Sequence, residues 1–242
     1  MNLILDVGNT FLKLAVFDKG RLIEKYIGKL VDLDVLIKEV LLSYPQVKQA
    51  IVSSVGKLKQ EHVKILKAKM PVIELSHELK LPFKNLYKSP KTLGVDRIAL
   101  VCASVEQFPN TNVLIIDAGT CITYDFINTQ NEYLGGAISP GIRLRYRSLN
   151  NLTANLPLLD TEIPDTIIGD STQQSIHSGV MYGVLKEIDG VIDDYAKKYS
   201  DLTVILTGGD TKFLSNQLKN SIFANSNFLL EGLNFILEYN RQ

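Results

Sequence analysis

The stretch that decides the fold is "LILDVGNTFLKLAVFD", from Leu3 to Asp18. An apolar run ends in Asp6 and Gly8, and a second apolar run continues beyond Lys13. A hairpin with only a structural role needs no more than Asn-Gly at its tip. Here the order Asp-x-Gly-Asn-Thr places a carboxylate, two short hydrogen-bonding side chains and a lysine around one tight turn. The stretch therefore predicts two strands joined by a turn that carries ligand-binding groups.

The same pattern returns in "VLIIDAGTCITYDFI", residues 113–127. A buried strand again ends in Asp-x-Gly-Thr, at Asp117 to Thr120, and another strand follows. Asp117 follows Asp6 by 111 residues (117 − 6), which is close to half of the 242-residue chain. Because strands are followed by helices in both parts, the sequence predicts an α/β protein of two related halves, residues 1–110 and 111–242, joined near 109–112.

Apolar spacing predicts the other elements. Strands are expected at 21–28, at 49–56 with its end at Gly56, at 70–75 and at 203–210. Helices are expected at 32–44, at 58–69, after Gly94, after Ser171 and at 229–239. The segments 76–93 and 135–142 ("GGAISPGI") are interpreted as an irregular surface loop and a glycine-rich loop.

Composition excludes several classes of protein. The chain has 26 basic and 26 acidic residues, so no net charge attracts nucleic acid or an anionic membrane surface. The apolar run before Asp6 is too short for a signal peptide, and no run reaches the roughly 20 residues of a membrane span. Cys102 and Cys121 are expected to be small core residues in a reducing compartment. We expect a soluble, cytoplasmic protein without nucleic-acid or membrane partners.

The two acid turns suggest phosphate chemistry. Glycine lets a backbone approach a ligand closely, and turn N–H groups bind anions as a nest. A carboxylate in each turn would repel phosphate unless a cation lies between them, and Mg²⁺ is the usual partner of triphosphate oxygens. Lys13 can neutralise further charge. One such turn is commonly an ordinary turn, but two copies at matched places favour phosphate binding between two facing halves.

Other motifs leave alternatives open. Gly208 and Gly209, in "LTGGD", lack side chains that would block a nucleotide base or ribose, but a glycine pair also ends strands for plain turn reasons. Asp96, at the start of a helix, can be a base kept ionised by the helix dipole or only a cap. Arg97 beside it can grip a carboxylate or phosphate with two bonds. Tyr87 can be a packed loop aromatic.

The remaining polar residues carry weaker signals. His62, His77 and His177 lack metal-ligand spacing and are interpreted as structural. The arginines in "IRLRYRS", at 143, 145 and 147, are interpreted as a solvated or anion-facing stretch. The usual nucleotide, dinucleotide and hydrolase loop motifs do not occur in the sequence.

Taken together, the motifs resemble those of the type III pantothenate kinases, from residue 3 to about 240. These kinases belong to the acetate-kinase, sugar-kinase, Hsp70 and actin superfamily. The resemblance rests on an ordered set: Asp-Val-Gly-Asn-Thr with Lys13, Tyr87 with Pro90, Gly94-Val95-Asp96-Arg97, Asp117-Ala118-Gly119-Thr120, Gly135-Gly136 with Pro140-Gly141, Ser171-Thr172, and Thr207-Gly208-Gly209.

The resemblance implies a duplicated ribonuclease-H-like (actin-like ATPase) fold, with two βββαβα-type halves around a nucleotide cleft. It implies a homodimer that phosphorylates pantothenate with ATP, giving 4'-phosphopantothenate in the first step of coenzyme A biosynthesis. A nucleotide-binding accessory protein of the same fold without turnover is the alternative. A phosphohydrolase of the superfamily is a further one.

The resemblance also implies residue roles. Asp96 would be the catalytic base, Asp117 would coordinate a monovalent cation, K⁺ or NH₄⁺, and Asp6 would hold Mg²⁺ directly or through water. ATP would contact Thr120, the glycine pair and the first turn, a set that comprises Asp6, Val7, Gly8, Asn9, Thr10, Phe11, Leu12, Lys13, Thr120, Gly208 and Gly209. Pantothenate would contact Tyr87, Gly94, Val95, Asp96, Arg97 and Thr172. Ser171 departs from the family's usual Asn and has a shorter reach.

Overall fold

The computed structural model describes residues 1–55 and 58–241, and the chain divides into two compact units. The first unit comprises Met1–Asn110, Thr129–Leu134 and Asn227–Gln242, and the second comprises Thr111–Asn128 and Gly135–Ser226. The predicted halves meet at the same place, after residue 110, but they assign the final helix to the second half. In the structure this helix packs within the first unit.

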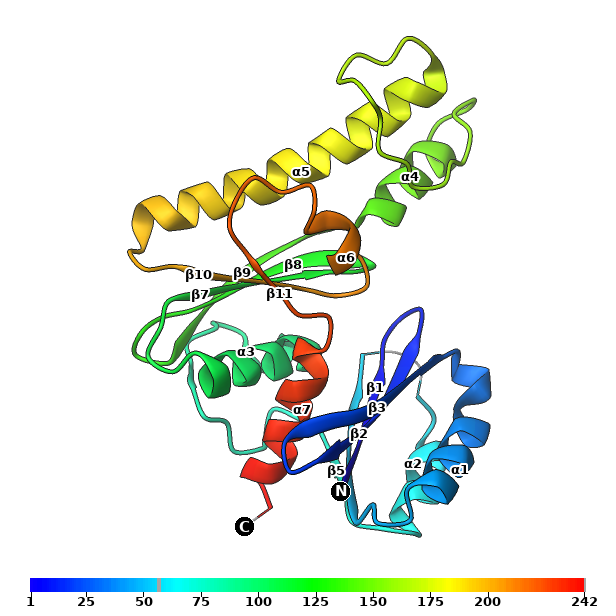
Figure 1. Ribbon diagram of the computed structural model, residues 1–242, viewed down its shortest axis with the longest axis vertical. Helices are drawn as coiled ribbons and strands as arrows, with labels where there is room; N and C mark the ends of the chain where they lie inside the picture. Colours follow the sequence, from blue (N-terminus) through cyan, green and yellow to red (C-terminus); the bar gives the residue numbers. More distant parts are fainter. Residues whose placement is uncertain (56–57, 242) are drawn as a thin grey trace. The chain divides into compact units, whose positions relative to one another are not determined.

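The first unit contains a five-stranded sheet in the order β3-β2-β1-β4-β5 (Figure 1). Its strands are β1 (Asn2–Val7), β2 (Leu12–Asp18), β3 (Arg21–Gly28), β4 (Gln49–Ser54) and β5 (Val72–Glu74). β2 runs antiparallel to β1 and β3, whereas β4 runs parallel to β1 and β5. All five strands confirm the predictions from apolar spacing. The predicted strand end at Gly56 lies outside the described residues.

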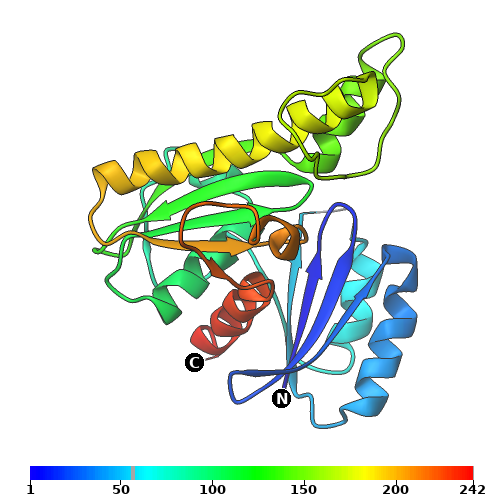
Figure 2. The same cartoon turned by 45° about the horizontal axis from the view of Figure 1, so that its top comes forward.

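Helices cover both faces of this sheet. α1 (Leu33–Ser43) and α2 (Gln60–Lys67) pack on the face that carries Leu3, Leu5 and Val7. The final helix, α7 (Phe228–Tyr239), packs against β1, β4 and α3 (Val95–Gln107) (Figure 2).

A glycine permits the close contact between α7 and α3. A Cβ added at Gly232 would lie 2.0 Å from the carbonyl oxygen of Ala99. A hydrogen bond of 2.8 Å from Asn2 Nδ2 to Asn234 Oδ1 ties α7 to β1. The final helix is therefore a built part of the first unit. Two short 3₁₀ turns, η1 (Leu30–Asp32) and η2 (Pro90–Thr92), complete the unit's helical segments in the described residues.

The second unit repeats the sheet of the first. Its order β11-β10-β7-β8-β9 matches β5-β4-β1-β2-β3 position by position. The strands are β7 (Val113–Ala118), β8 (Cys121–Ile127), β9 (Glu132–Pro140), β10 (Thr203–Thr207) and β11 (Phe223–Ala224). β7 is antiparallel to β8 and parallel to β10, and β10 is parallel to β11, as in the first unit. The duplicated ribonuclease-H-like fold is confirmed.

The glycine-rich segment was predicted incorrectly as a loop. Residues 132–140 form strand β9, and a Cβ at Gly136 would lie 1.6 Å from the carbonyl oxygen of Tyr124 on β8. Gly135 has a positive φ of 108°. Glycine in a strand marks a close backbone approach, so the residues that suggested a loop are those that allow β9 to lie against β8. The start of β9, which belongs to the first unit, pairs there with β6 (Lys84–Asn85).

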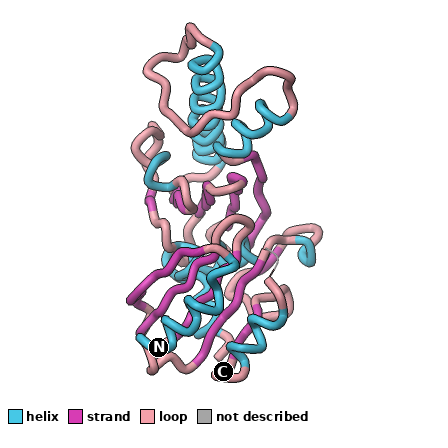
Figure 3. Tube along the Cα trace, turned by 90° about the vertical axis from the view of Figure 1, so that its right-hand side faces the viewer, coloured by secondary structure: helices cyan, strands magenta, loops and turns pink. Residues whose placement is uncertain are grey.

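Three helices belong to the second unit: α4 (Ile142–Asn151), α5 (Thr172–Lys198) and α6 (Thr211–Leu214). α5 packs on one face of this unit's sheet. The segment 152–171 connects the end of α4 to the first turn of α5 (Figure 3). The α4 helix was not predicted. Its arginines alternate in sequence, but Ile142 and Tyr146 are buried at the i, i+4 spacing of a helix.

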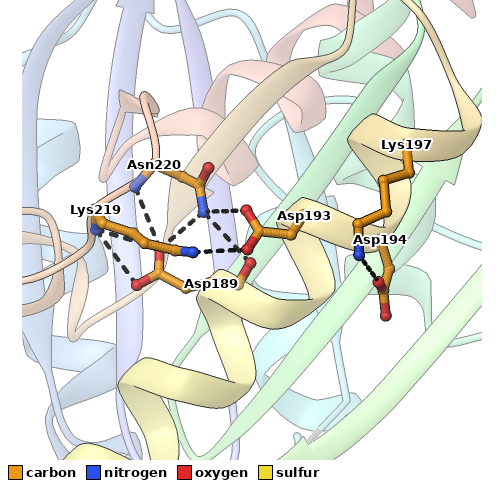
Figure 4. A network of polar contacts seen from close by, with 6 residues as sticks. All are labelled: Asp189, Asp193, Asp194, Lys197, Lys219 and Asn220. Atoms are coloured by element: carbon orange, nitrogen blue, oxygen red, sulfur yellow. Dashed lines mark hydrogen bonds and ion pairs between the residues drawn. The ribbon is translucent and has the colours of Figure 1, made fainter.

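A polar network fixes the segment after α6 to α5 (Figure 4). The buried carboxylate of Asp189 accepts hydrogen bonds from the backbone N–H groups of Lys219 and Asn220, each at 3.2 Å. Asn220 Nδ2 donates to Asp189 Oδ1 at 2.9 Å, and Lys219 forms an ion pair with Asp193 at 2.7 Å. These bonds satisfy a buried charge and at the same time order a segment without regular structure.

Candidate functional site

The first acid corner is built from three neighbouring strands. Asp6 is the fifth of the six residues of β1, and it pairs with Lys13 on β2 and with Ser53 on β4. Residues paired across strands share a face of the sheet, so the lysine and the hydroxyl flank the carboxylate. The turn is closed by a 3.1 Å hydrogen bond from the N–H of Gly8 to the carbonyl of Phe11.

The electrostatics of Asp6 are unusual. Asp6 is 7% exposed, and burial raises its pKa from 3.8 to about 6. Lys13 opposes this rise in pKa, and the negative charge of Asp96 adds to it. The structure therefore brings two predicted functional carboxylates, Asp6 and Asp96, into the same electrostatic environment within the first unit. Such a pair binds a cation or a proton readily.

Asp96 lies in the first turn of α3, as predicted. Gly94 is the N-cap, and a Cβ there would lie 2.3 Å from Asp96 Oδ1, so the absence of a side chain gives the carboxylate its position. Asp96 Oδ1 accepts the N–H of Arg97 at 2.8 Å. The carboxylate therefore satisfies one N–H group of the first helical turn. Since a carboxylate has two oxygens and about four lone-pair sites, this bond leaves acceptor capacity for a substrate hydroxyl.

The side chains of Arg97 and Tyr87 pack against each other in the first unit. The Arg97 guanidinium lies 5.8 Å from the centroid of the Tyr87 ring, in cation–π geometry, and Arg97 is only 5% exposed. Tyr87 is half-buried, and its N–H donates to Asn85 Oδ1 at 2.9 Å. The sequence left Tyr87 open between packing and function. The structure shows it packed against a predicted substrate-binding residue.

The second acid corner has the same strand geometry in the second unit. Asp117 is the fifth residue of β7, and it pairs with Thr123 on β8 and Thr207 on β10. The partner on the parallel strand is thus a hydroxyl residue in both units, whereas the lysine of the first unit is replaced by a threonine in the second. Thr120 is exposed at the tip of the turn, between Gly119 and the exposed Cys121. The prediction that both cysteines are core residues is confirmed for Cys102 and wrong for Cys121, because the turn ends at that residue.

Glycine 208 closes this corner. Its φ is +98°, and a Cβ at Gly208 would lie 2.4 Å from Asp117 Oδ1 and 2.3 Å from the carbonyl oxygen of Ala118. Gly209 next to it has open space around its Cβ position. The strand-end glycine pair therefore contains one residue that the turn requires and one that leaves room, consistent with both readings of the motif.

Thr172 begins α5 and lines a pocket of about 880 Å³ in the second unit. The lining combines hydroxyl groups of Ser148, Ser171, Thr172 and Ser175 with an apolar side. Ser171 is the N-cap of α5, and its Oγ accepts the N–H of Gln174 at 3.3 Å. The shorter serine thus has a capping role.

The pocket also contains a residue whose role the sequence did not indicate. Arg145 forms an ion pair with Glu187 at 2.5 Å, and Tyr124 donates a hydrogen bond to the same carboxylate at 2.9 Å. The burial of Glu187 raises its pKa, but the hydrogen bonds from Arg145, Ser139 and Tyr124 outweigh this effect, so the pKa lies below its ordinary value. Only the fold reveals that these distant residues meet.

The histidines have structural partners. His62 Nδ1 lies 2.9 Å from Asp34 Oδ1, His77 Nε2 lies 2.7 Å from the carbonyl of Leu93, and His177 Nδ1 lies 2.8 Å from the Tyr146 hydroxyl. Within residues 1–55 and 58–241, no group of three or more His, Cys, Asp or Glu side chains is placed to hold a metal ion. In the same residues, no helix is both long and apolar enough to cross a bilayer.

Two sheets that share the same order over five strands, each with an aspartate near the end of its first strand, are the arrangement of the actin-like ATPase fold. The comparisons agree with this fold. A family model for type III pantothenate kinase matches residues 2–194. A type III pantothenate kinase from Christiangramia forsetii is 52% identical and covers 100% of this chain and 99% of its own. The chain belongs to the type III pantothenate kinase family.

Solved structures support the fold. A Campylobacter jejuni protein described as a Baf family transcriptional activator has a TM-score of 0.61 and 24% identity, covering 99% of this chain and 98% of its own. A ROK family glucokinase from Streptomyces griseus has a TM-score of 0.55 and 12% identity, covering 100% of this chain and 99% of its own. At these identities the likeness concerns the fold alone.

Proposed function

We propose that the chain is a phosphotransferase that moves the γ-phosphoryl group of ATP to the alcohol of pantothenate. The product is 4'-phosphopantothenate, and the reaction is the first step of coenzyme A biosynthesis. Membership of the family supports the substrate pair. The structural observations that carry the proposal are the pairing of Asp6 with Lys13 across β1 and β2 and the position of Asp96 and Arg97 in the first turn of α3, all within the first unit.

Asp96 is the proposed catalytic base. The pantothenate hydroxyl attacks the γ-phosphorus, the bond from that phosphorus to the bridging oxygen breaks, ADP leaves, and the hydroxyl proton passes to Asp96. Phosphoryl transfer has a loose transition state, so positioning and charge neutralisation supply most of the rate. A carboxylate within hydrogen-bond reach can orient the alcohol and take its proton late in the transfer.

Each unit carries residues proposed for contact with ATP. In the first unit, the turn from Asp6 to Lys13 offers N–H groups and a lysine to the phosphates. In the second unit, the proposed residues are Thr120, Gly208 and Gly209. In the first unit, the residues proposed to hold pantothenate beside Asp96 are Tyr87, Gly94, Val95 and Arg97. In the second unit, Thr172 is the residue proposed for contact with pantothenate. A buried arginine suits the carboxylate of pantothenate, because its fork of N–H donors matches the two carboxylate oxygens.

The donor groups fit the two cations that the family implies. Mg²⁺ is usually held by one or two carboxylates, phosphate oxygens and water, so Asp6 suffices as its protein ligand without a three-residue cage. Burial, and to a smaller extent the negative charge of Asp96, raises the pKa of Asp6, and a bound cation would favour its ionised form. Bound Mg²⁺ neutralises phosphate charge.

Asp117 fits a monovalent cation, K⁺ or NH₄⁺. Its pairing partners on the flanking strands, Thr123 and Thr207, carry hydroxyl oxygens, which together with the carboxylate are oxygen donors that suit such a cation. We further propose that the protein acts as a homodimer in the cytoplasm.

The test is an ADP-release assay with purified protein, Mg·ATP and KCl, with and without pantothenate. Release that depends on pantothenate, together with 4'-phosphopantothenate detected by mass spectrometry, supports the kinase. Release without pantothenate indicates a phosphohydrolase. Nucleotide binding without release in either condition indicates an accessory protein and refutes the proposal.

A further inference from the structure

Tyr133, which belongs to no predicted site, packs against Tyr87, and Tyr87 packs against Arg97. The Tyr133 ring is fully buried in the first unit. The ring centroid lies 6.1 Å from that of Tyr87, at an interplanar angle of 34°, and 6.0 Å from that of Phe83 in edge-to-face geometry. Such pairs are favourable and also directional, so they restrict the orientation of the partner ring.

The backbone around Tyr133 restricts the same segment. Lys84 and Asn85 on β6 pair with Glu132 and Tyr133 on β9. The N–H of Leu86 donates to the carbonyl oxygen of Tyr133 at 3.0 Å. The residue directly before Tyr87 is therefore hydrogen-bonded to Tyr133, and the Tyr87 ring packs on its side chain.

Tyr87 connects Tyr133 to Arg97, because its ring contacts both side chains. The guanidinium is buried and lies 5.8 Å from the Tyr87 ring centroid. Arginine stays charged in proteins, so a buried guanidinium depends on nearby π faces and acceptors for its stability. A shift of the Tyr87 ring would change the environment and the rotamer of Arg97.

We infer that Tyr133 is a positioning residue for pantothenate binding. It holds the Tyr87 ring in place, and the Tyr87 ring in turn holds Arg97. Tyr133 touches neither substrate, and its role rests on the proposed function of these two residues. Residues that support a binding group from behind commonly set how well that group performs. The segment Thr129–Leu134 follows residue 110 in sequence but belongs to the first unit. It thus supplies a support for the proposed pantothenate-binding residues.

The kinetic test compares Tyr133→Leu, which removes the ring, with Tyr133→Phe, which keeps it. Tyr133→Leu is expected to raise KM for pantothenate about threefold to tenfold, the range that one aromatic pair represents. KM for ATP is expected to stay within about twofold, and Tyr133→Phe is expected to restore KM for pantothenate. Phe17→Leu, another loss of a buried ring in the first unit, is the control for general destabilisation and should leave both KM values unchanged.

A readout independent of turnover is the NMR signal of the Arg97 Nε–H group in the free protein. The ring current of Tyr87 is expected to shift this signal in the wild type and in Tyr133→Phe, and the shift should be lost in Tyr133→Leu. This readout decides the positioning role even if the wild type lacks pantothenate-dependent turnover, an outcome that would refute only the proposed function.

Two outcomes would overturn the inference. One is a folded Tyr133→Leu protein with unchanged KM for pantothenate and an unchanged Arg97 signal. The other is an equal rise of both KM values in Tyr133→Leu and Phe17→Leu, which indicates a structural role alone. Should Tyr133→Leu fail to fold, Tyr133→Met fills the same space without a ring and takes its place in both measurements.

Discussion

The two acid corners have the same strand geometry and different surroundings. In each unit an aspartate is the fifth residue of the first strand, with a neighbour on the antiparallel strand and one on the parallel strand. Asp6 has Lys13 beside it and feels Asp96, whereas Asp117 has Thr123 and Thr207. The duplicated fold supplies the position of a carboxylate, and the flanking residues determine what it can bind.

The corners also differ in what confines the carboxylate. The pKa of Asp6 is governed by burial and by charged side chains. Asp117 instead lies against the backbone of Gly208, where a Cβ would come within 2.4 Å of Asp117 Oδ1. This difference is the basis for proposing Mg²⁺ and phosphates at the first corner and a monovalent cation at the second.

The largest expected effect is that of Asp96→Asn. Since the amide cannot accept the hydroxyl proton, kcat should fall by about two or more orders of magnitude, while KM for ATP and for pantothenate changes little. Steady-state kinetics measures both. Glu106→Gln, the same chemical change at the other end of α3, is the control and should keep kcat. Near-normal turnover in Asp96→Asn would remove Asp96 from the role of base.

Gly208→Ala should lower the free energy of unfolding by about 2 kcal/mol, because a residue with a side chain is strained at this positive φ and its Cβ meets Asp117 and Ala118. Gly209→Ala, where the Cβ position is open, is the matched control. Denaturant unfolding of both variants measures the difference. Equal stability of the two variants would contradict the idea that backbone confines Asp117.

Asp6→Asn should stabilise the ligand-free protein above pH 6. The folded-state pKa of about 6 exceeds 3.8, so between these values the folded chain binds a proton that the unfolded chain releases. Stability from Asp6 is therefore lost as pH rises through this window. Removing the buried charge should gain about 2 kcal/mol at pH 7.5 and little at pH 4. Thermal unfolding at both pH values measures it, and a pH-independent gain would contradict the assignment.

The smallest expected effect is that of Asp117→Asn on cation dependence. The variant should lose about tenfold in the activation of ADP formation by KCl relative to choline chloride, because an amide attracts a cation less than a carboxylate does. Asp194→Asn, an exposed carboxylate on α5, is the control. Full activation by KCl in Asp117→Asn would place the cation elsewhere.

Much of this arrangement could be predicted from local patterns. Continuous apolar runs and the Asp-x-Gly turns predicted the strands that carry Asp6, Lys13 and Asp117, and the helical period predicted α3 with Asp96 in its first turn. These features depend on neighbours in sequence, so single segments reveal them.

The features that could not be predicted depend on contacts between distant segments. Gly135 and Gly136 suggested a loop because glycine usually marks one, whereas in the strand Gly135 has a positive φ and Gly136 lies against the backbone of β8. The packing of Tyr133 on Tyr87 depends on the pairing of β6 with β9. The return of the final helix to the first unit likewise follows from its packing on α3.

The most direct test of the central claim is a carboxyl ¹³C NMR titration of Asp6 in the ligand-free wild type and in Asp96→Asn. If a buried Asp6 faces the charge of Asp96 within the first unit, the wild type should show a pKa of about 6 for Asp6, and the variant should show a lower one. An Asp6 that titrates at its ordinary value in both proteins would contradict the account.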